Sequence, residues 1–396
     1  MKDILFLAHR APFPPDRGDR IRSFNVLRYL GRRARVHLVA FADSADACAP
    51  APELCALTAS CSIIHRRKSR GRAALEAIAG GRPVSLAAFD DPALHSAVAG
   101  VLDAHRIEAI YCFSGQMAQY LPMAGPRVLM DFVDVDSAKF AAMALQGPLP
   151  LRWLMRREAG LLGAFEQQVA RKADATAFVS AAEAALFACE GGRGNIVAVE
   201  NGIDALRFDP AIVTPRSFSA PTIVFTGQMD YPPNVDAVTW FAREVLPLVH
   251  RRFPTTRFAI VGRAPTAAVR ALAGEHVEVT GEVADTRPWL TGAALVVAPL
   301  SLARGIQNKV LEAMAMARPV VATGSAADGI DHAGTLHVAD GVAPFAAAVV
   351  ALLGEPSSAA GMGERARARV ISRYAWDARL APLDALLGLG AERAAA

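Results

Sequence analysis

The chain has 396 residues, of which 53% are hydrophobic and 20% are charged. This composition is typical of folded α/β proteins and excludes a largely disordered chain, and the length is sufficient for two domains. The formal net charge of +4 is too small to indicate a nucleic-acid-binding protein, and no nucleic-acid-binding motif occurs in the sequence.

The cysteines and the apolar runs predict a cytoplasmic protein. The five cysteines form no CxxC pair and no metal-ligand spacing, a pattern that is typical of reduced thiols. The apolar run at residues 4–8 is too short for a signal peptide, and no run approaches the roughly 18 apolar residues of a membrane span. We therefore expect a protein of the cytoplasm.

Basic residues are concentrated in two segments near the beginning of the chain. Eight arginines occur within residues 10–35, and the run HRRKSRGR covers residues 65–72. Such runs usually form a solvated surface. The alternative is a face that meets an anionic membrane, here the inner face of the plasma membrane, or an acceptor that carries a diphosphate.

In the first half of the chain, short apolar runs alternate with helical patterns. Strands are predicted at residues 3–8, 36–41, 109–113, 127–133 and 175–180, and helices at 21–30, 92–105 and 151–173. This alternation predicts a parallel, doubly wound sheet with the strand ends facing one side.

The loop after the first predicted strand is a candidate ligand-binding segment. It lacks a GxGxxG motif, which makes a dinucleotide-binding turn improbable, but it contains Gly18, Asp19 and Arg20. Gly18 permits backbone amides to approach an anion closely. The alternative is an ordinary connection between a strand and a helix.

Three aspartates follow the strand predicted at residues 127–133. Asp131, Asp134 and Asp136 could hold Mg²⁺ or Mn²⁺, because carboxylate oxygens suit these ions. The alternative, which we favour, is that Asp136 or Ser137 caps the next helix. We therefore expect no metal site.

The second half of the chain repeats the alternation of strands and helices. Strands are predicted at residues 222–226, 257–261, 277–281, 294–298 and 320–323. Gly227 and Gln228 follow the first of these strands, where parallel sheets bind ligands, and Asn234 is expected to cap a helix over residues 235–250. Arg263 follows the second strand, where it can bind a phosphate bidentately or remain a surface charge.

Residues 294–323 combine a strand, a tight loop at Arg304 and Gly305, a helix beginning near Gln307, and a second strand. Lys309 lies near the helix N-terminus, where anions bind favourably. Glu312 lies one turn later, where it can accept hydrogen bonds from ribose hydroxyls. The alternative is an ion pair between Lys309 and Glu312 on a solvated helix face.

Four segments carry a resemblance to a known family. They are PPDRGDR at 14–20, VENGID at 199–204, GQMDYPPN at 227–234, and GIQNKVLEAMA with ARPVVAT at 305–323. Together they resemble GT-B glycosyltransferases, specifically the retaining family 4 enzymes. The resemblance is to bacterial sugar transferases of exopolysaccharide loci, of the PEP-CTERM or exosortase-associated type.

The resemblance implies two Rossmann-like domains that face a central cleft, with a C-terminal helix that crosses back to the first domain. The boundaries it implies are residues 1–212 with 375–396 for an acceptor-side domain, and 213–374 for a nucleotide-sugar-binding domain. Gly18, Asp19 and Arg20 are then expected to face the cleft, and Asp134 to lie near the reacting sugar.

The implied reaction moves a sugar from a nucleotide-diphosphate donor to an acceptor hydroxyl of a glycan or lipid-linked molecule. It proceeds with retention and uses no metal or other cofactor. Lys309 matches a residue that binds the diphosphate, Glu312 matches the one that holds the ribose, and Arg263 is expected to assist Lys309. The turn whose backbone amides face the sugar and phosphate is matched by Gly305 and Ile306, and Gln307 and Asn308 are expected to bind the donor beside it.

Arg304 departs from the family pattern, because it occupies the position of a conserved family glutamate that contacts the sugar. Two alternatives to a transferase therefore remain open. One is a nucleotide-sugar epimerase on the same fold, with His9, Asp131 and Asp134 as acid/base candidates. The other is a catalytically silent protein that binds a nucleotide or a partner.

Overall fold

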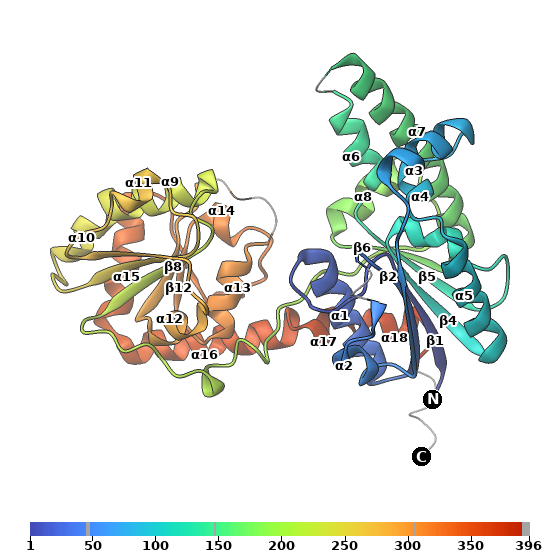
Figure 1. Ribbon diagram of the computed structural model, residues 1–396. Helices are drawn as coiled ribbons and strands as arrows, with labels where there is room; N and C mark the ends of the chain where they lie inside the picture. Colours follow the sequence, from blue (N-terminus) through green and yellow to red (C-terminus); the bar gives the residue numbers. More distant parts are fainter. Residues whose placement is uncertain (45–47, 146–147, 302, 304–305, 390–396) are drawn as a thin grey trace. The chain divides into compact units, whose positions relative to one another are not determined.

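The computed structural model describes residues 1–44, 48–145, 148–301, 303 and 306–389. The chain forms two compact units (Figure 1). Unit 1 comprises Met1–Asn201 and Arg379–Ala396, and unit 2 comprises Gly202–Ala378. The sequence placed these divisions at residues 212 and 374, and it correctly predicted that the C-terminal helical segment returns to the first unit.

Unit 1 is built on a parallel sheet in the order β3-β2-β1-β4-β5-β6-β7. The strands are β1 (Asp3–Ala8), β2 (Arg35–Ala42), β3 (Ser60–His65), β4 (Ile107–Phe113), β5 (Arg127–Val133), β6 (Ala175–Phe178) and β7 (Ile196–Ala198). The central strands β1, β2 and β4 are almost wholly buried, because helices cover both faces of a parallel sheet.

The helices of unit 1 connect these strands (Figure 1). They are α1 (Gly18–Gly31), α2 (Pro52–Cys55), α3 (Arg70–Ala79), α4 (Val84–Ala87), α5 (Pro92–Ala104), α6 (Asp136–Met143), α7 (Leu149–Lys172), α8 (Ala181–Cys189) and α18 (Pro382–Leu386), with a 3₁₀ turn at Gly115–Tyr120. The C-terminal segment is fixed to this unit by Lys2, whose ammonium donates to the Gly388 carbonyl at 2.7 Å, and by an ion pair of Arg379 with Glu200 at 2.8 Å.

Unit 2 repeats the architecture with a six-stranded parallel sheet in the order β10-β9-β8-β11-β12-β13. Its strands are β8 (Thr222–Thr226), β9 (Arg257–Val261), β10 (Val277–Gly281), β11 (Leu295–Ala298), β12 (Val320–Ala322) and β13 (His337–Val338). Its helices are α9 (Pro232–Trp240), α10 (Leu246–His250), α11 (Ala267–Arg270), α12 (Arg287–Gly292), α13 (Asn308–Ala315), α14 (Gly324–Ala327), α15 (Val342–Gly354) and α16 (Pro356–Arg373), with a π-helical turn at Phe241–Val245 and a 3₁₀ turn at Pro210–Ile212. Helix α17 (Trp376–Leu380) spans the division between the units.

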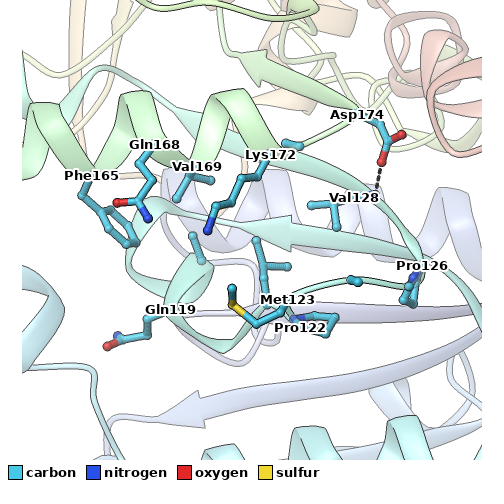
Figure 2. Close-up of a pocket in the computed structure, with 15 residues that line it drawn as sticks. Gln119, Pro122, Met123, Pro126, Val128, Phe165, Gln168, Val169, Lys172 and Asp174 are labelled. Carbon is cyan, nitrogen blue, oxygen red and sulfur yellow. Dashed lines mark hydrogen bonds between the residues drawn. The ribbon is translucent and has the colours of Figure 1, made fainter.

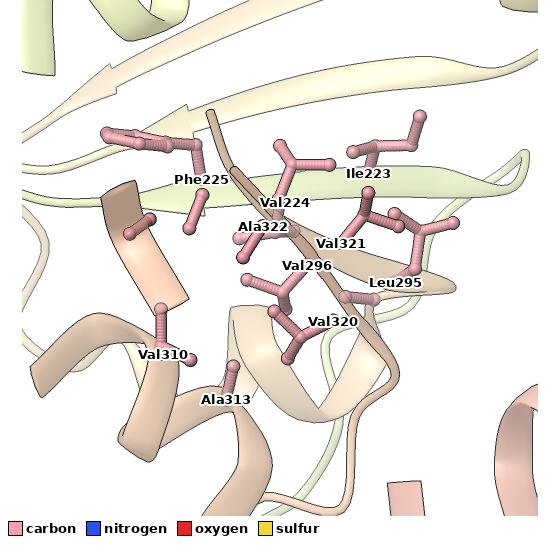
Figure 3. Packing of buried hydrophobic residues seen from close by; sticks show 14 of the residues in the cluster. Ile223, Val224, Phe225, Leu295, Val296, Val310, Ala313, Val320, Val321 and Ala322 are labelled. Atoms are coloured by element: carbon pink, nitrogen blue, oxygen red, sulfur yellow. The ribbon is translucent and has the colours of Figure 1, made fainter. Parts of the chain in front are cut away.

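The core of unit 2 explains why α13 has its position. Figure 3 shows Val310 and Ala313 on the side of α13 that faces Val296 and Val320 of the sheet. All four side chains are at most 1% exposed. Burial of this apolar stripe leaves the polar residues of α13 on its remaining face, so packing fixes the orientation of Lys309 and Glu312.

The predicted boundaries were wrong at several helix starts. Helix α1 begins at Gly18 rather than residue 21, so Gly18, Asp19 and Arg20 form a first helical turn and not a loop. Gly18 has no positive φ, and a Cβ there would meet nothing within 4 Å, so glycine is not required at this position. The edge strand β3 was not predicted, because its residues are only half-buried and lack a clear apolar run.

Two predicted helix caps were also wrong. Helix α9 begins at Pro232, since proline is tolerated in a first helical turn, so Asn234 lies inside the helix. The residue before α6 is Val135, and neither Asp136 nor Ser137 is its N-cap. Ser137 instead uses its hydroxyl and amide to bond Glu166 of α7.

Among the described residues, no single helix has the length and hydropathy needed to cross a membrane; only α15 and α16 taken together, bent by 104°, meet this criterion.

A buried ion pair joins α1 to the sheet of unit 1. Arg22 is 1% exposed, and its Nε donates to Asp131 Oδ2 of β5 at 2.9 Å, while Nη1 donates to Asn201 Oδ1 at 2.9 Å. The hydroxyl of Tyr111 donates to the same Asp131 oxygen. Asp131 itself is completely buried. Removal of Arg22 would therefore leave an uncompensated charge in the interior.

We predict that Arg22→Ala lowers the free energy of unfolding by about 3–5 kcal/mol, because a buried carboxylate loses its charged partner. The control is Arg17→Ala, which removes an exposed arginine paired with Asp16 and should cost less than about 1 kcal/mol. Urea denaturation followed by circular dichroism measures both. Similar small losses in the two variants would show that Arg22 does not anchor α1.

Candidate functional site

The carboxyl edge of the unit 2 sheet contains a reversal in strand order. Strand β8 lies between β9 and β11, so the chain winds outward in one direction from β8 and in the other from β11. In doubly wound sheets, ligands bind where the order reverses, beyond the carboxyl ends of the strands. Gly227 follows β8, Gly262 follows β9, and the segment after β11 leads into α13.

Gly227 and Gly262 allow the two strand ends to approach each other closely. A Cβ at residue 262 would lie 1.7 Å from the Gly227 carbonyl oxygen. A Cβ at residue 227 would lie 2.8 Å from Asn234 Nδ2 and 3.3 Å from Lys309 Nζ. Position 262 therefore excludes any side chain, whereas a side chain at position 227 would displace the end of Asn234.

Hydrogen bonds connect the loops after β8 and β9. Asn234 Nδ2 donates to the Gln228 carbonyl at 2.8 Å, and Arg263 Nη2 donates to Gln228 Oε1 at 3.0 Å. The Met229 amide also donates to the Arg263 carbonyl at 2.9 Å. The structure thus brings together Gly227, Gln228 and Arg263, which the sequence had assigned to the site, and adds Asn234 to them.

Lys309 lies in the first turn of α13 and points toward these loops. Its Nζ donates a hydrogen bond to Asn234 Oδ1 and lies 4.5 Å from the centre of the Phe225 ring, which gives a cation–π contact. Burial lowers the pKa of Lys309 to about 8, although the negative charge of Glu312 acts in the opposite direction. The site therefore holds a partly desolvated cation beside a helix N-terminus, an arrangement that favours anion binding.

Glu312 lies one turn further along α13 and is largely withdrawn from solvent. Burial raises its pKa to about 7, while the positive charges of Arg207 and Lys309 act in the opposite direction. Lys309 directs its ammonium to Asn234, so the two residues do not form the solvated surface pair that was the alternative interpretation. A carboxylate in this position can accept hydrogen bonds from hydroxyl groups of a ligand.

The segment before α13 is described only in part. Ile306 packs against the core of unit 2, Gln307 is the residue immediately before the helix, and Asn308 is its first residue and is exposed. Arg304 and Gly305, which the sequence assigned to the sugar-facing turn, lie outside the described residues.

In unit 1, the first turn of α1 forms a cluster of charges with the end of β1. Asp19 Oδ2 accepts a hydrogen bond from Arg10 Nη1 at 2.7 Å and lies 3.3 Å from His9 Nε2. The hydrogen bond from His9 lowers the pKa of Asp19 well below its ordinary value, and Arg10 acts in the same direction. Arg20 pairs with Asp16 and Asp43. Asp19 and Arg20 thus each pair with other residues of this cluster, and Gly18 is the first residue of the helix beside them.

The three aspartates in and after β5 do not converge on a common point. Asp131 is buried with Arg22, whereas Asp134 and Asp136 pair with Lys139 at 2.7 and 3.2 Å. Over the described part of the chain, no group of three His, Cys, Asp or Glu side chains has an arrangement that could hold a metal ion. Asp134 is half-buried and its carboxylate remains accessible to a ligand.

Three residues of the unit 2 site had no functional role in the sequence interpretation. Asn234 looked like a helix cap, Phe225 lay in a predicted strand, and Arg207 was assigned no role. The close spacing of GQMDYPPN after a strand was a signal for Asn234, because it places a polar side chain at the carboxyl edge. Phe225 and Arg207 act on Lys309 and Glu312 through tertiary packing, which spacing alone does not reveal.

Unit 1 contains a cavity of about 370 Å³ near the amino ends of its strands. Figure 2 shows Phe165, Gln168 and Lys172 of α7 facing the loop that carries Pro122 and Met123. Asp174 accepts a hydrogen bond from the Val128 amide near the start of β5, so this cavity lies by the amino ends of the strands. Ligands of doubly wound sheets bind at the carboxyl ends, and the cavity is therefore separate from the candidate site.

Residues 220–355 match the family described as "Glycosyl transferases group 1", and this range includes Asn234, Lys309 and Glu312 but not Arg207. Sucrose-phosphate synthase from Thermosynechococcus elongatus is 15% identical, with a TM-score of 0.58 and 98% of each chain covered. HepE from Anabaena, solved in complex with UDP, is 16% identical with a TM-score of 0.58, and the match covers 98% of this chain and 100% of HepE. No curated protein matches the sequence.

A third structure is WaaG, a glycosyltransferase involved in lipopolysaccharide biosynthesis, at 16% identity and a TM-score of 0.55, with 98% of this chain and 100% of that chain covered. The fold is GT-B. Both Rossmann-like units therefore follow the architecture that the sequence predicted.

We predict that Gly262→Ala lowers the free energy of unfolding by about 1–3 kcal/mol, because its methyl group would overlap the Gly227 carbonyl. Gly274→Ala is the matched control in the same unit, since a Cβ there meets nothing within 4 Å, and it should change stability by less than about 0.5 kcal/mol. Thermal and urea unfolding measure both. Equal stability of the two variants would mean that the strand ends are not closely packed.

Proposed function

We propose that this protein is a glycosyltransferase that moves a sugar from a nucleotide-diphosphate sugar to an acceptor hydroxyl. The observation that carries the proposal is the half-buried ammonium of Lys309, held at the first turn of α13 where the strand order of unit 2 reverses. The match of residues 220–355 to "Glycosyl transferases group 1" supports it, because the matched range contains this site. HepE, whose fold is similar, was solved with UDP and with UDP-glucose.

Lys309 has the properties needed to stabilise a departing diphosphate. When the bond between sugar and diphosphate breaks, negative charge accumulates on the diphosphate oxygens. A fixed cation and the amides of a helix N-terminus stabilise that charge in the transition state without reorganisation. Arg263, held beside Gln228 at 3.0 Å, adds a second cation at the edge of the site. In this mechanism, catalysis is electrostatic, and no protein side chain attacks the sugar.

Glu312 would hold the donor by its ribose. Its carboxylate follows Lys309 by three residues on the same helix, so a nucleotide whose diphosphate meets Lys309 places its ribose one turn further along. The Gly227 backbone, Gln228 and the segment of Ile306, Gln307 and Asn308 would complete the donor site. Arg304 and Gly305 would contact the sugar, and Arg304 would change its selection relative to enzymes with a glutamate there.

We further propose transfer with retention and without a metal ion or other cofactor, in the manner of the family 4 enzymes that the sequence resembles. The leaving diphosphate would help to deprotonate the acceptor. Asp134, whose carboxylate is accessible in unit 1, is the proposed residue near the reacting sugar, and the turn of Gly18, Asp19 and Arg20 would contact the acceptor. The acceptor would be a glycan or lipid-linked molecule of cell-surface glycan synthesis, such as an exopolysaccharide precursor.

The epimerase alternative is less well supported by the geometry. It needs an acid/base side chain at the sugar, and Asp131, one of its candidates, is completely buried with its carboxylate bonded to Arg22 and Tyr111. His9 is engaged with Asp19. Detection of free nucleoside diphosphate identifies a transferase, because neither an epimerase nor a silent protein releases it. The configuration of the recovered nucleotide sugar separates the other two, since an epimerase changes it and a silent protein does not.

We predict that Lys309→Ala lowers the release of nucleoside diphosphate from the preferred nucleotide sugar roughly a hundredfold, comparable to the loss of one charge-stabilising donor. UDP-, GDP- and ADP-linked hexoses are the donors to compare. Arg251→Ala, which removes an exposed cation of the same unit, is the control and should retain full turnover. Glu312→Gln should mainly weaken donor binding. Unchanged turnover of Lys309→Ala would remove this residue from the mechanism.

The affinity for nucleoside diphosphate should depend on pH through Lys309. In the free protein its pKa is about 8, so above this pH binding must first protonate the amine, and affinity should fall by up to about tenfold per pH unit. Below this pH Lys309 is already protonated, and its titration no longer changes the affinity.

Lys309→Arg is the control for the pH dependence, because a guanidinium stays charged throughout the range and should give a flat profile at lower affinity. Calorimetric titration between neutral and alkaline pH measures both proteins. Identical profiles for the wild type and Lys309→Arg would contradict the assignment of the titrating group.

A further inference from the structure

The C-terminal end of α6 and the N-terminal end of α7 expose an unusual number of large apolar side chains. The exposed fractions are 59% for Met143, 72% for Leu145, 76% for Leu149, 46% for Leu151 and 59% for Trp153. We call these five residues the α6–α7 tip; residues 146–147 between them lie outside the described part of the chain. Scattered exposed apolar residues are ordinary, but five within eleven positions are a concentration of the kind that marks an interaction surface.

Polar contacts with α3 and α4 hold α7 in place next to the tip. Glu158 of α7 accepts hydrogen bonds from the Val84 and Ser85 amides at 2.7 and 2.8 Å. Arg157 donates to the Ala77 carbonyl of α3 at 2.8 Å. At the other end of the pair, Ser137 of α6 bonds Glu166 of α7. In Figure 1, α6 and α7 extend together away from the sheet of unit 1, so the exposure of the tip follows from a fixed arrangement of both helices.

The charged residues of the tip segment are all basic. From residue 140 to residue 157 the sequence contains Arg152, Arg156 and Arg157 and no aspartate or glutamate, whereas Lys139, just before this segment, is paired with Asp134 and Asp136. Arg156 is exposed, and Arg152 reaches across to donate to the Ala144 carbonyl at 3.2 Å. Apolar side chains with an aromatic residue, bordered by cations, match the boundary between acyl chains and anionic headgroups of a bilayer.

We propose that the α6–α7 tip docks this protein on an anionic lipid bilayer. Leu149 and Trp153 enter the acyl boundary, and Arg156 meets lipid phosphates. A second copy of the chain is a poorer occupant, because a two-fold contact through this tip would bring the same cations together with no acidic residue between them. The proposal concerns the surface of unit 1 and does not rest on the proposed reaction.

The test is sedimentation of the full chain with vesicles of phosphatidylcholine and of phosphatidylcholine mixed with phosphatidylglycerol. We expect binding to the mixed vesicles, weaker binding at high salt, and little binding to phosphatidylcholine alone. The fluorescence of Trp153 is a second readout, because the other three tryptophans are shielded from solvent: Trp289 and Trp376 are 7% and 4% exposed, and Trp240 is half-buried. Its emission should shift to the blue on binding, and Trp153→Phe should bind without that shift.

Variants locate the binding surface. Replacement of both Leu149 and Trp153 by serine should weaken binding to the mixed vesicles by about tenfold or more, and Arg156→Gln by roughly fivefold. The matched control is Met123→Ser, which removes an exposed apolar side chain of unit 1 outside the tip, 89% exposed, and should bind like the wild type. All these positions are exposed, and circular dichroism confirms that the variants fold.

Three outcomes would overturn the proposal. One is failure of the wild type to bind the mixed vesicles. Another is equal binding by the wild type and the Leu149→Ser, Trp153→Ser double variant. The third is self-association in sedimentation velocity that this double variant abolishes while vesicle binding persists, which would make the tip a contact between copies of the chain.

Discussion

The site in unit 2 depends on the desolvated ammonium of Lys309. A lysine loses favourable hydration when it is buried, and here the negative charge of Glu312 partly offsets that loss, while Asn234 accepts the hydrogen bond of the ammonium and the Phe225 ring faces it. The negatively charged diphosphate of a bound nucleotide would form an ion pair with this ammonium. The close packing of Gly227 on Gly262 brings the ends of β8 and β9 together beside Asn234 and Lys309.

Much of the fold could be predicted from the sequence, because the apolar strands and their alternation with helices are local patterns. Both doubly wound sheets and the return of the C-terminus to unit 1 were predicted correctly. The half-buried edge strand β3 was missed, since an edge strand needs less apolar sequence. Helix starts at Gly18 and Pro232 were placed too late, because glycine and proline were interpreted as loop residues.

The candidate site was only partly accessible from sequence. Lys309 and Glu312 were assigned to the site through the resemblance of residues 305–323 to a known family, because their spacing alone was equally compatible with a surface ion pair. The partners that set their environment were not found, since Asn234 lies 75 residues from Lys309 along the chain. The same limit applies to Asp131, which looked like a metal or acid/base candidate until Arg22, 109 residues away, was seen to pair with it in the interior.

The most direct test of the account is calorimetry of the purified protein with UDP, GDP and ADP, each with and without EDTA. The account predicts that one of the three binds with clear preference, that EDTA leaves its affinity unchanged, and that Lys309→Ala abolishes the heat of binding. If none of the three binds the wild-type protein, Lys309 does not form a donor site, and the glycosyltransferase proposal is wrong.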